Sequence, residues 1–310
     1  YLLSDKDDYR QVACRTIDYM IAHLYSDAVP GFRGSQGAHS EYFSLRMAAR
    51  DGQTPPATDN ACYTASNARA VTLLLDASWK LERPALGQLA LDVLAPMSKM
   101  AREGRLSHVY TEAGPSPVTA FLADWAGLLD ALLAAYHHTG QEDYLEGAKG
   151  AGAVLVDRFF DQDKGGFFDT EEDADAIGYL QVREKPLPEN VAAALALLNL
   201  YQATRNTDYR EVAQATLSAF AESYREYGEF SAVYGLAVHH LLNSPVEITI
   251  EGSAQDQGTM AMLRAAVRLP YPNLEIRPVW AENADTPAQA QVCLDTLCLP
   301  PVSDPEDLAA

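Results

Sequence analysis

The sequence predicts a mainly α-helical fold: an incomplete α/α toroid of about eight helices, followed by a small α/β unit. The first observation is an internal repeat. Three segments, beginning at Asp8, Asp143 and Asp208, share an Asp-Tyr start and an alanine near the end of the first turn. The second and third are 65 positions apart, and the first lies 135 positions before the second. This period exceeds the roughly 34 to 47 residues of common helical solenoids. It fits a helical hairpin with a long loop.

The second observation is apolar spacing typical of amphipathic helices. The first such segment covers residues 9–25. Residues 30–60 are rich in glycine and proline and are predicted to form a loop. Further helices are predicted at 61–82, 84–103, 117–138, 142–160, 189–204, 208–226 and 229–242, with proline, glycine or asparagine at their breaks.

The third observation is a change of pattern after Pro245. Alternating residues predict a strand at 246–250, a helix follows at 257–269, and two more strands are predicted at 274–279 and 290–294. We therefore divide the chain into residues 1–244, the toroid hairpins, and 245–310, the α/β unit. Cys293 and Cys298 lie in a strand–turn segment, where both a disulfide and two free thiols are open alternatives. Cys14 and Cys62 lie in helical patterns and are predicted to be buried thiols.

Composition excludes several classes of protein. The net charge of −20 argues against binding to nucleic acid or to anionic membrane surfaces, since both require a basic face. No apolar run approaches the 18 or so residues of a membrane span. We expect a cytoplasmic protein. Because the chain begins at Tyr1, with no basic and apolar leader, we also expect a missing upstream part.

The sequence has many acidic residues, and their positions relative to the predicted helices decide which of them are candidate site residues. Asp124 lies in an apolar run at a helix start, where a carboxylate is costly unless it is paired or hydrogen-bonded. Asp124 is therefore either a satisfied cap or a site residue. Glu189 and Asn190 also stand at a helix start and have capping as their alternative role. Arg183 and Lys185 are candidates to clamp an anionic or polyhydroxyl ligand, although solvated loop charges are equally ordinary.

We expect neither a metal nor a cofactor. The adjacent pairs His137-His138 and His239-His240 end helices, where the helix dipole favours a cation, and neighbouring residues point apart. No phosphate loop, zinc-spaced cysteine set or hydrolase serine motif is present. Redox chemistry through the last two cysteines is a weaker alternative.

At these positions and in the tail the chain resembles the C-terminal part of the YyaL-like family, bacterial relatives of the spermatogenesis-associated thioredoxin-like proteins. The matching residues are Gly165–Asp169, Arg183–Asn190, Leu122–Asp124, and the tail from Val292 through Pro305, including both late cysteines. The resemblance implies a thioredoxin-like domain and first barrel hairpins upstream of this chain. It also implies a six-hairpin barrel similar to that of N-acylglucosamine 2-epimerases and six-hairpin glycosidases.

The resemblance implies a carbohydrate ligand and an epimerase-like or glycosidase-like activity. Asp124 and Glu189 are then the acid–base candidates. Arg183, Lys185 and Asn190 would place the substrate, and Tyr63, Asn67 and Trp125 complete the expected binding set.

Two loops depart from the family pattern. Where the family tends to have Ser-Gln-Asp-Ala-Asp, this chain has Gly37 and His39 in place of the acids. Where it tends to have Tyr-Thr-Asp-Trp-Asn, this chain has Ala65 and Ser66. Acid–base catalysis needs a titratable group within reach of the substrate. These replacements predict a degenerate site with little or no catalytic activity on sugars. The alternative function is a non-catalytic binding or scaffold subunit of a larger assembly.

Two architectural predictions follow. Tyr9, Tyr144 and Tyr209 should occupy equivalent places in three hairpins. Eight helices fall four short of the twelve in a closed six-hairpin ring. The apolar face around Val12 and Ile17 of the first hairpin should therefore pack on upstream residues or on another chain.

Overall fold

The computed structural model describes residues 2, 4, 6–37, 39–50, 52–281, 283, 286–295 and 297–308. Eight long helices form the body of this part of the chain. They are α1 (Asp7–His23), α4 (Thr64–Lys80), α5 (Ala85–Arg102), α6 (Leu122–Thr139), α7 (Glu142–Arg158), α8 (Leu187–Thr204), α9 (Thr207–Ala219) and α10 (Ala232–Leu242). The mainly α fold that the periodicity predicts is confirmed.

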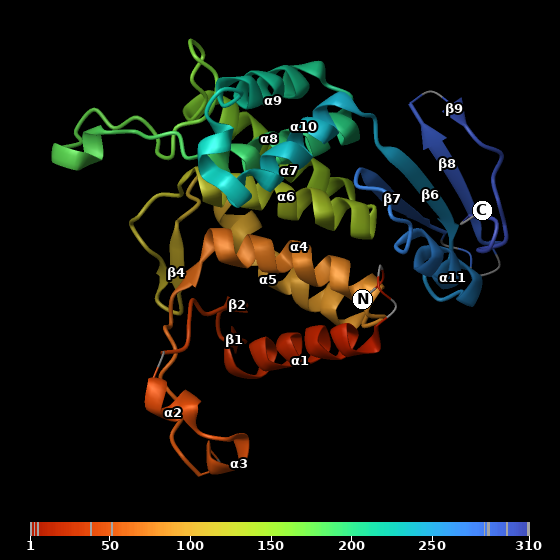
Figure 1. Cartoon of the computed structure of the whole chain (residues 1–310), viewed down its shortest axis with the longest axis horizontal. Helices are drawn as coiled ribbons and strands as arrows, with labels where there is room; N and C mark the ends of the chain where they lie inside the picture. Colours follow the sequence, from red (N-terminus) through yellow and green to blue (C-terminus); the bar gives the residue numbers. More distant parts are fainter. Residues whose placement is uncertain are drawn as a thin grey trace.

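The helices form two layers (Figure 1). In the inner layer α4 packs against α6, α6 against α8, and α8 against α10. Each of α4, α6 and α8 also packs against the helix that follows it, α5, α7 or α9, in the outer layer. α6 is apolar almost all round because it has neighbours on several sides. Leu128, Leu129, Leu132 and Leu133 of this helix are at most 2% exposed.

The first helix is packed less tightly than the others. α1 has no buried residue, Val12 is 52% exposed, and Ile17 and Ile21 are only partly buried against the main core. Whether upstream residues or another chain cover this face stays a prediction. Tyr9, Tyr144 and Tyr209 are each the third residue of their helix. However, Tyr9 is 54% exposed, whereas the other two pack on the core.

Two predicted helix boundaries are wrong. The helix predicted at 117–138 begins only at Leu122. β4 (Val109–Thr111) and β5 (Gly114–Pro115) lie before it, and residues 117–121 are a non-helical segment in which Thr119 bridges to Ser107. β4 also pairs with β3 (Cys62–Tyr63), which precedes α4. The helix predicted at 208–226 ends at Ala219, and η2 (Tyr224–Ser231) follows as a 3₁₀ helix. Gly228 within it has a φ of 56°, which a continuous α-helix does not permit.

The predicted loop at 30–60 contains short elements. β1 (Tyr25–Ser26) pairs with β2 (Gly31–Phe32) just after α1. The short helices α2 (Ser40–Ser44) and α3 (Met47–Arg50) follow and project from the body (Figure 1).

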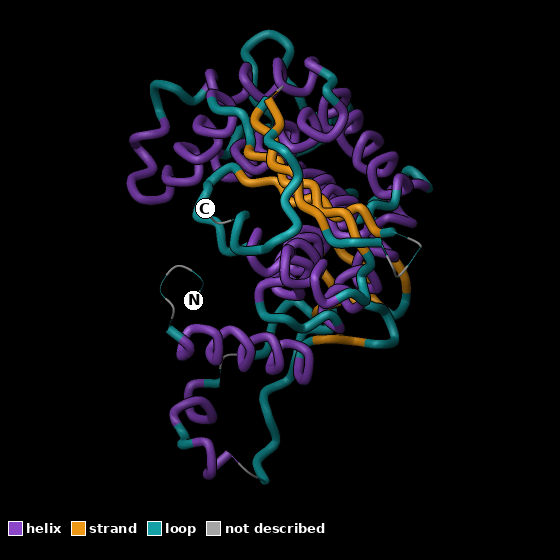
Figure 2. Tube along the Cα trace, turned by 90° about the vertical axis from the view of Figure 1, so that its right-hand side faces the viewer, coloured by secondary structure: helices purple, strands orange, loops and turns teal. Residues whose placement is uncertain are grey.

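The C-terminal unit is a four-stranded sheet in the order β7-β6-β8-β9. β6 (Val246–Gly252) runs parallel to β7 (Leu274–Trp280) and antiparallel to β8 (Gln289–Leu294). α11 (Gln257–Ala266) connects the two parallel strands. Ile248 and Ile250 of β6 are almost fully buried, in a core separate from that of the helices. The predicted buried strand is confirmed. The boundary at residue 244 stays a prediction. Figure 2 shows the sheet lying in front of the helical layers.

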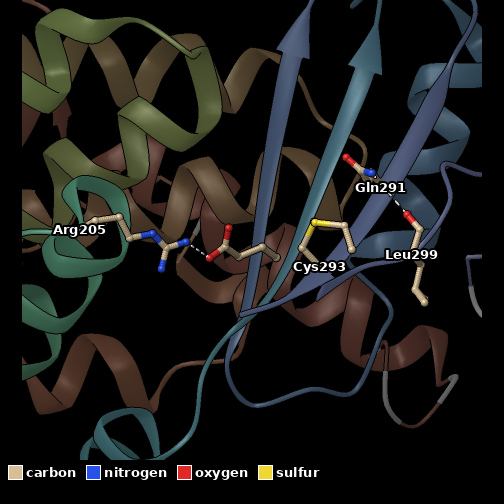
Figure 3. The surroundings of a disulfide bond; sticks show 6 residues. Arg205, Gln291, Cys293 and Leu299 are labelled. Atoms are coloured by element: carbon tan, nitrogen blue, oxygen red, sulfur yellow. Dashed lines mark hydrogen bonds and ion pairs between the residues drawn. A yellow bond between two sulfur atoms is a disulfide. The ribbon is translucent and has the colours of Figure 1, made fainter. Parts of the chain in front are cut away.

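Cys293 and Cys298 form a disulfide with their Cα atoms 4.0 Å apart, which resolves the alternative that the sequence leaves open. It joins β8 to β9 (Leu297–Cys298). Figure 3 shows it beside the Gln291 to Leu299 hydrogen bond and the Arg205–Glu247 ion pair, which links α8 to β6. Cys62 is a buried free thiol, as predicted, whereas Cys14 is only partly buried.

The sheet packs on the C-terminal ends of the inner helices (Figure 1). β7 contacts α6, and the Trp280 indole donates to the carbonyl of His138 at 3.3 Å. The opposite ends, where the inner helices begin, carry the long loops. None of the helices in the described ranges is both long and apolar enough to cross a membrane.

Candidate functional site

The predicted site residues gather at the N-terminal ends of α4, α6 and α8. Asp124 is the third residue of α6, and Glu189 and Asn190 are the third and fourth of α8. Asn67 is the fourth residue of α4, and Tyr63 precedes that helix. Because the inner helices pack side by side, residues far apart in the sequence meet at this end of the molecule.

Asp124 is fully buried and hydrogen-bonded on every side. Its carboxylate accepts from the amide of Phe121 at 2.8 Å, from the amide of Ala65 at 2.9 Å, and lies 2.9 Å from Nδ1 of His108. Burial raises the pKa of Asp124, and the Phe121 amide, His108 and the Ala65 amide oppose that rise. Asp124 thus caps the N-terminus of α6, as the sequence suggests, and it also contacts His108, which the sequence does not show.

His108 is the one residue of this cluster that sequence reasoning missed. It lies before β4, sixteen positions ahead of Asp124, and no spacing rule connects the two. Its carbonyl accepts from the amide of Thr64, and its own amide donates to Val118, so the loop backbone holds the ring beside α6. The side chain is 28% exposed. Since Asp124 already receives two amide donors, it acts as the ionised acceptor and His108 donates from Nδ1.

Two aromatic rings flank His108. The ring of Phe121 lies 4.6 Å from it, centroid to centroid, and that of Tyr63 lies 5.6 Å away in an edge-on arrangement. The Tyr63 hydroxyl donates to Asp59 at 3.3 Å, and the charge of Asp59 raises the pKa of Tyr63. With Nδ1 bound to Asp124, Nε2 of His108 carries the lone pair and has no partner in the described part of the chain.

Asn67 and Asn190 form matching clamps in two hairpins. Asn67 accepts from the amide of Phe32 at 2.6 Å and donates to the carbonyls of Phe32 and Tyr63 at 2.9 and 3.0 Å. Asn190 accepts from the amide of Phe167 at 2.6 Å and donates to the carbonyls of Phe167 and Pro186, both at 2.9 Å. Both asparagines are fully buried.

A glycine precedes the clamped phenylalanine in each hairpin. A Cβ at Gly31 would lie 3.3 Å from the amide oxygen of Asn67, and one at Gly166 would lie 3.2 Å from that of Asn190. The clamps therefore need the close approach that glycine allows. They indicate that the α1–α4 and α7–α8 hairpins are copies of one unit.

Arg183 and Lys185 are also tied to the protein itself. The Lys185 ammonium group lies 2.6 Å from Asp161 and donates to the carbonyl of Gly165, also at 2.6 Å. The Arg183 guanidinium donates to the carbonyl of Thr170 at 3.0 Å and lies 4.0 Å from the centre of the Phe168 ring. Both cations thus brace the loop between α7 and α8.

In the described part of the chain, the side chains of Glu189 and Trp125 make no hydrogen bond or ring contact with the cluster around His108. Glu189 is half-buried, and its Oε2 atom is buried without a hydrogen-bond partner there. Trp125 is 4% exposed and lines a groove between α5 and α7 with Ser98 and Gly147. The catalytic and binding roles assigned to the predicted site residues stay predictions. In the described ranges no three His, Cys, Asp or Glu side chains are arranged to hold a metal ion.

Comparison with known protein families and with curated proteins finds no match. The structure does resemble solved ones. Cellobiose 2-epimerase from Bacillus thermoamylovorans is 13% identical with a TM-score of 0.59, covering 84% of this chain and 71% of that one. D-mannose isomerase is 16% identical with a TM-score of 0.53, covering 70% and 54%.

A family 105 glycoside hydrolase from C. acetobutylicum is 11% identical with a TM-score of 0.53, covering 71% of this chain and 59% of that one. This chain thus spans about half the length of D-mannose isomerase and 71% of the length of the epimerase. At these identities the likeness concerns the fold alone. The helical body thus has an α/α toroid fold, and four helical hairpins are present in the described part of this chain.

Proposed function

We propose that this protein acts on a carbohydrate by proton transfer, in the manner of an epimerase or isomerase, with His108 as the base. The observation that carries the proposal is the pairing of the buried Asp124 with the partly exposed His108. A histidine with Nδ1 held by a carboxylate and Nε2 unoccupied is the usual arrangement of a general base. The fold likeness to a sugar epimerase and a sugar isomerase supports the choice of substrate class.

The same geometry argues against a two-carboxylate glycosidase. That chemistry needs two carboxyl groups about 5 to 9.5 Å apart, both touching the substrate. Asp124 is fully buried and receives two backbone amides as well as His108, so it acts here as a positioning residue. The amide that binds one of its oxygens belongs to Ala65, which stands where the YyaL-like family tends to have an acid. Membership of that family, and the upstream thioredoxin-like domain that it implies, are part of this proposal.

In the proposed reaction, Nε2 of His108 accepts the proton next to the sugar carbonyl. Asp124 stabilises the imidazolium that forms and keeps the ring in one tautomer. Return of the proton to the neighbouring carbon gives the isomer. Its return to the same carbon after the enediolate has rotated about the C2–C3 bond, so that its other face meets His108, gives the epimer. Positioned bases of this kind contribute about 10²- to 10⁴-fold to rates.

Deuterium exchange tests the proposal directly. The full chain is incubated with D-mannose, D-glucose or cellobiose in D₂O, and NMR follows loss of the C2 proton and appearance of new sugars. We expect exchange by the wild type, loss of about 10²-fold or more in His108→Gln, and no change in His23→Gln, an exposed histidine on α1. Asp124→Asn should lower the rate, with urea unfolding used to confirm that the variant is folded.

A non-catalytic binding or scaffold subunit is the second candidate, and one observation favours it. Arg183, Lys185, Asn67 and Asn190 all bind the protein's own backbone, so the retained residues hold the fold. Absence of exchange in the wild type would overturn the proton-transfer proposal. Sugar binding detected by saturation-transfer NMR in the same sample would then favour the second candidate.

A further inference from the structure

A second polar region lies at the opposite ends of the inner helices, where the C-terminal sheet packs on the toroid. A partly open cavity of about 450 Å³ is lined there by α4, α6, α8 and the segment 267–276. This volume falls in the range of small-molecule sites, about 300 to 1,000 Å³. Thr72, Trp79, Asp130, His137, Asn199 and Glu275 line it. Because α6 and α8 are otherwise strongly apolar, these polar residues are unexpected in a purely structural interior.

The carboxylates of this cavity are incompletely paired. The hydroxyl of Thr72 donates to Asp130 at 3.2 Å. Burial raises the pKa of Asp130, against the opposing effects of Thr72, His137 and Asn199. Glu275 lies 3.1 Å from Nε2 of His137, an ion pair by distance but not a well-directed hydrogen bond. Its other oxygen, Oε2, is buried and has no hydrogen-bond partner among the residues described.

Two further histidines of the lining lack a partner for one ring nitrogen. His240 has Nε2 3.2 Å from the carbonyl of Pro272, so that nitrogen donates and Nδ1 carries the lone pair. His138 stacks on Trp79 with 4.7 Å between ring centroids, and burial lowers its pKa to about 4, which keeps it neutral at pH 7. In the described chain both Nδ1 atoms are buried without a hydrogen-bond partner. Together with Oε2 of Glu275, these nitrogens are buried polar atoms of the lining without a hydrogen-bond partner among the described residues.

The side chains that line the cavity also carry more negative than positive charge. Asp76, Asp130 and Glu275 contribute three carboxylates. Lys80 lies 2.8 Å from Asp76, and His137 is the partner of Glu275. Asp130 has only neutral donors in direct contact. Buried carboxylates are stable when a cation or several donors satisfy them.

Within the described chain, the lining does not offer the three or four protein ligands that are typical of a structural metal site. Over the described ranges no three His, Cys, Asp or Glu side chains are close enough together to share one ion. An organic cation that donates several hydrogen bonds would serve both the Asp130 carboxylate and the unpartnered Oε2 of Glu275. An alkylammonium group is such a cation, and its carbon chain suits the Leu75 and Leu133 side chains that also line the cavity.

We propose that this cavity binds a small primary amine, whose ammonium group is held by Asp130 and Glu275. The site lies at the other end of the inner helices from His108, so it is independent of the proposed sugar chemistry. Its position between the toroid and β7 means that a bound amine would hold the C-terminal unit on the helices.

The test compares putrescine with 1,4-butanediol, which has the same chain length but no charge. Titration calorimetry and Trp79 fluorescence are recorded on the full chain at constant ionic strength. We expect saturable binding of putrescine and none of the diol. Glu275→Gln and Asp130→Asn should each weaken putrescine binding about tenfold or more, since each removes a charged hydrogen-bond acceptor. Glu211→Gln, on the exposed surface of α9, is the matched control and should bind as the wild type does.

Three results would overturn the proposal. They are equal binding of the diol, equal loss in Glu211→Gln and Glu275→Gln, or no binding of putrescine to the wild type. Urea unfolding of each variant shows whether the variant is folded. If one of the two cavity variants is unfolded, the other is enough to test the proposal. The variant His108→Gln should bind putrescine normally, which separates this proposal from the one on sugars.

Discussion

Replacing Asn190 by alanine should destabilise the protein strongly without touching any ligand. The side chain is fully buried and makes three hydrogen bonds to backbone groups of Phe167 and Pro186. Its removal leaves the amide and the carbonyl of Phe167 without their partner, whereas the carbonyl of Pro186 keeps the backbone amide of residue 190. A buried group left unsatisfied costs about 1 to 3 kcal/mol. Allowing for partial relaxation, we expect the free energy of unfolding to fall by about 3 to 5 kcal/mol.

Asn67 provides an internal replicate of the same experiment. It makes the same three contacts, to Phe32 and Tyr63, at nearly the same distances. If the two hairpins are copies of one unit, Asn67→Ala and Asn190→Ala should cost the same within about 1 kcal/mol. Asn206 is the control: it caps α9 through a single exposed hydrogen bond, and its replacement should cost only about 1 kcal/mol.

The measurement is urea unfolding followed by circular dichroism, with the slope of the transition compared among variants to confirm that the unfolding reaction is unchanged. A loss smaller than that of Asn206→Ala for either buried asparagine would refute the clamp argument. A large loss for one and a small loss for the other would refute the equivalence of the hairpins.

Two further predictions concern pH. The pKa of His138 falls from 6.5 to about 4 on folding, so its stabilising effect is complete above pH 6.5 and is lost as the pH falls towards 4. Unfolding free energies measured across this range should fall by about 3 kcal/mol more in the wild type than in His138→Phe. Lys185→Met removes the partner of Asp161, whose pKa is lowered from 3.8 to about 2 chiefly by the Lys185 hydrogen bond. The melting temperature should drop at pH 7, and the difference from the wild type should shrink as the pH falls from 4 to 2; a difference independent of pH would contradict the ion pair.

Sequence patterns within a few residues were sufficient to predict most of the helices of the body. Helical periodicity and the punctuating glycines and prolines predict the eight long helices with small boundary errors, because these signals act within a few residues. The two larger errors, ahead of Leu122 and beyond Ala219, have a different cause. The first concerns residues 117–121, in which Thr119 bridges to Ser107 earlier in the chain, a pairing that no helical periodicity shows. The second concerns a turn at Gly228, whose backbone angle depends on its surroundings.

The residues of the candidate site also fall into two groups: those that the sequence could predict and those that only the tertiary structure reveals. Asp124 and Asn190 could be selected from the sequence because polar residues at the start of apolar helices need a reason to be there. Asn67 was selected only through the family resemblance. His108 could not be selected, since only the docking of the loop before β4 on α6 brings it to Asp124. Asp130 lies within an apolar run and was overlooked, and its neighbours Thr72 and Asn199 come from two other helices.

The order of helices and strands, their amphipathic faces and the internal repeat are thus encoded in short stretches of this chain. They were predictable because backbone hydrogen bonding and apolar burial follow local periodicity. The pairing of His108 with Asp124, the clamps of the two asparagines and the polar cavity beneath the sheet arise from contacts across tens to more than a hundred residues. Such contacts depend on how the helices pack against one another, and packing is a property of the assembled tertiary structure.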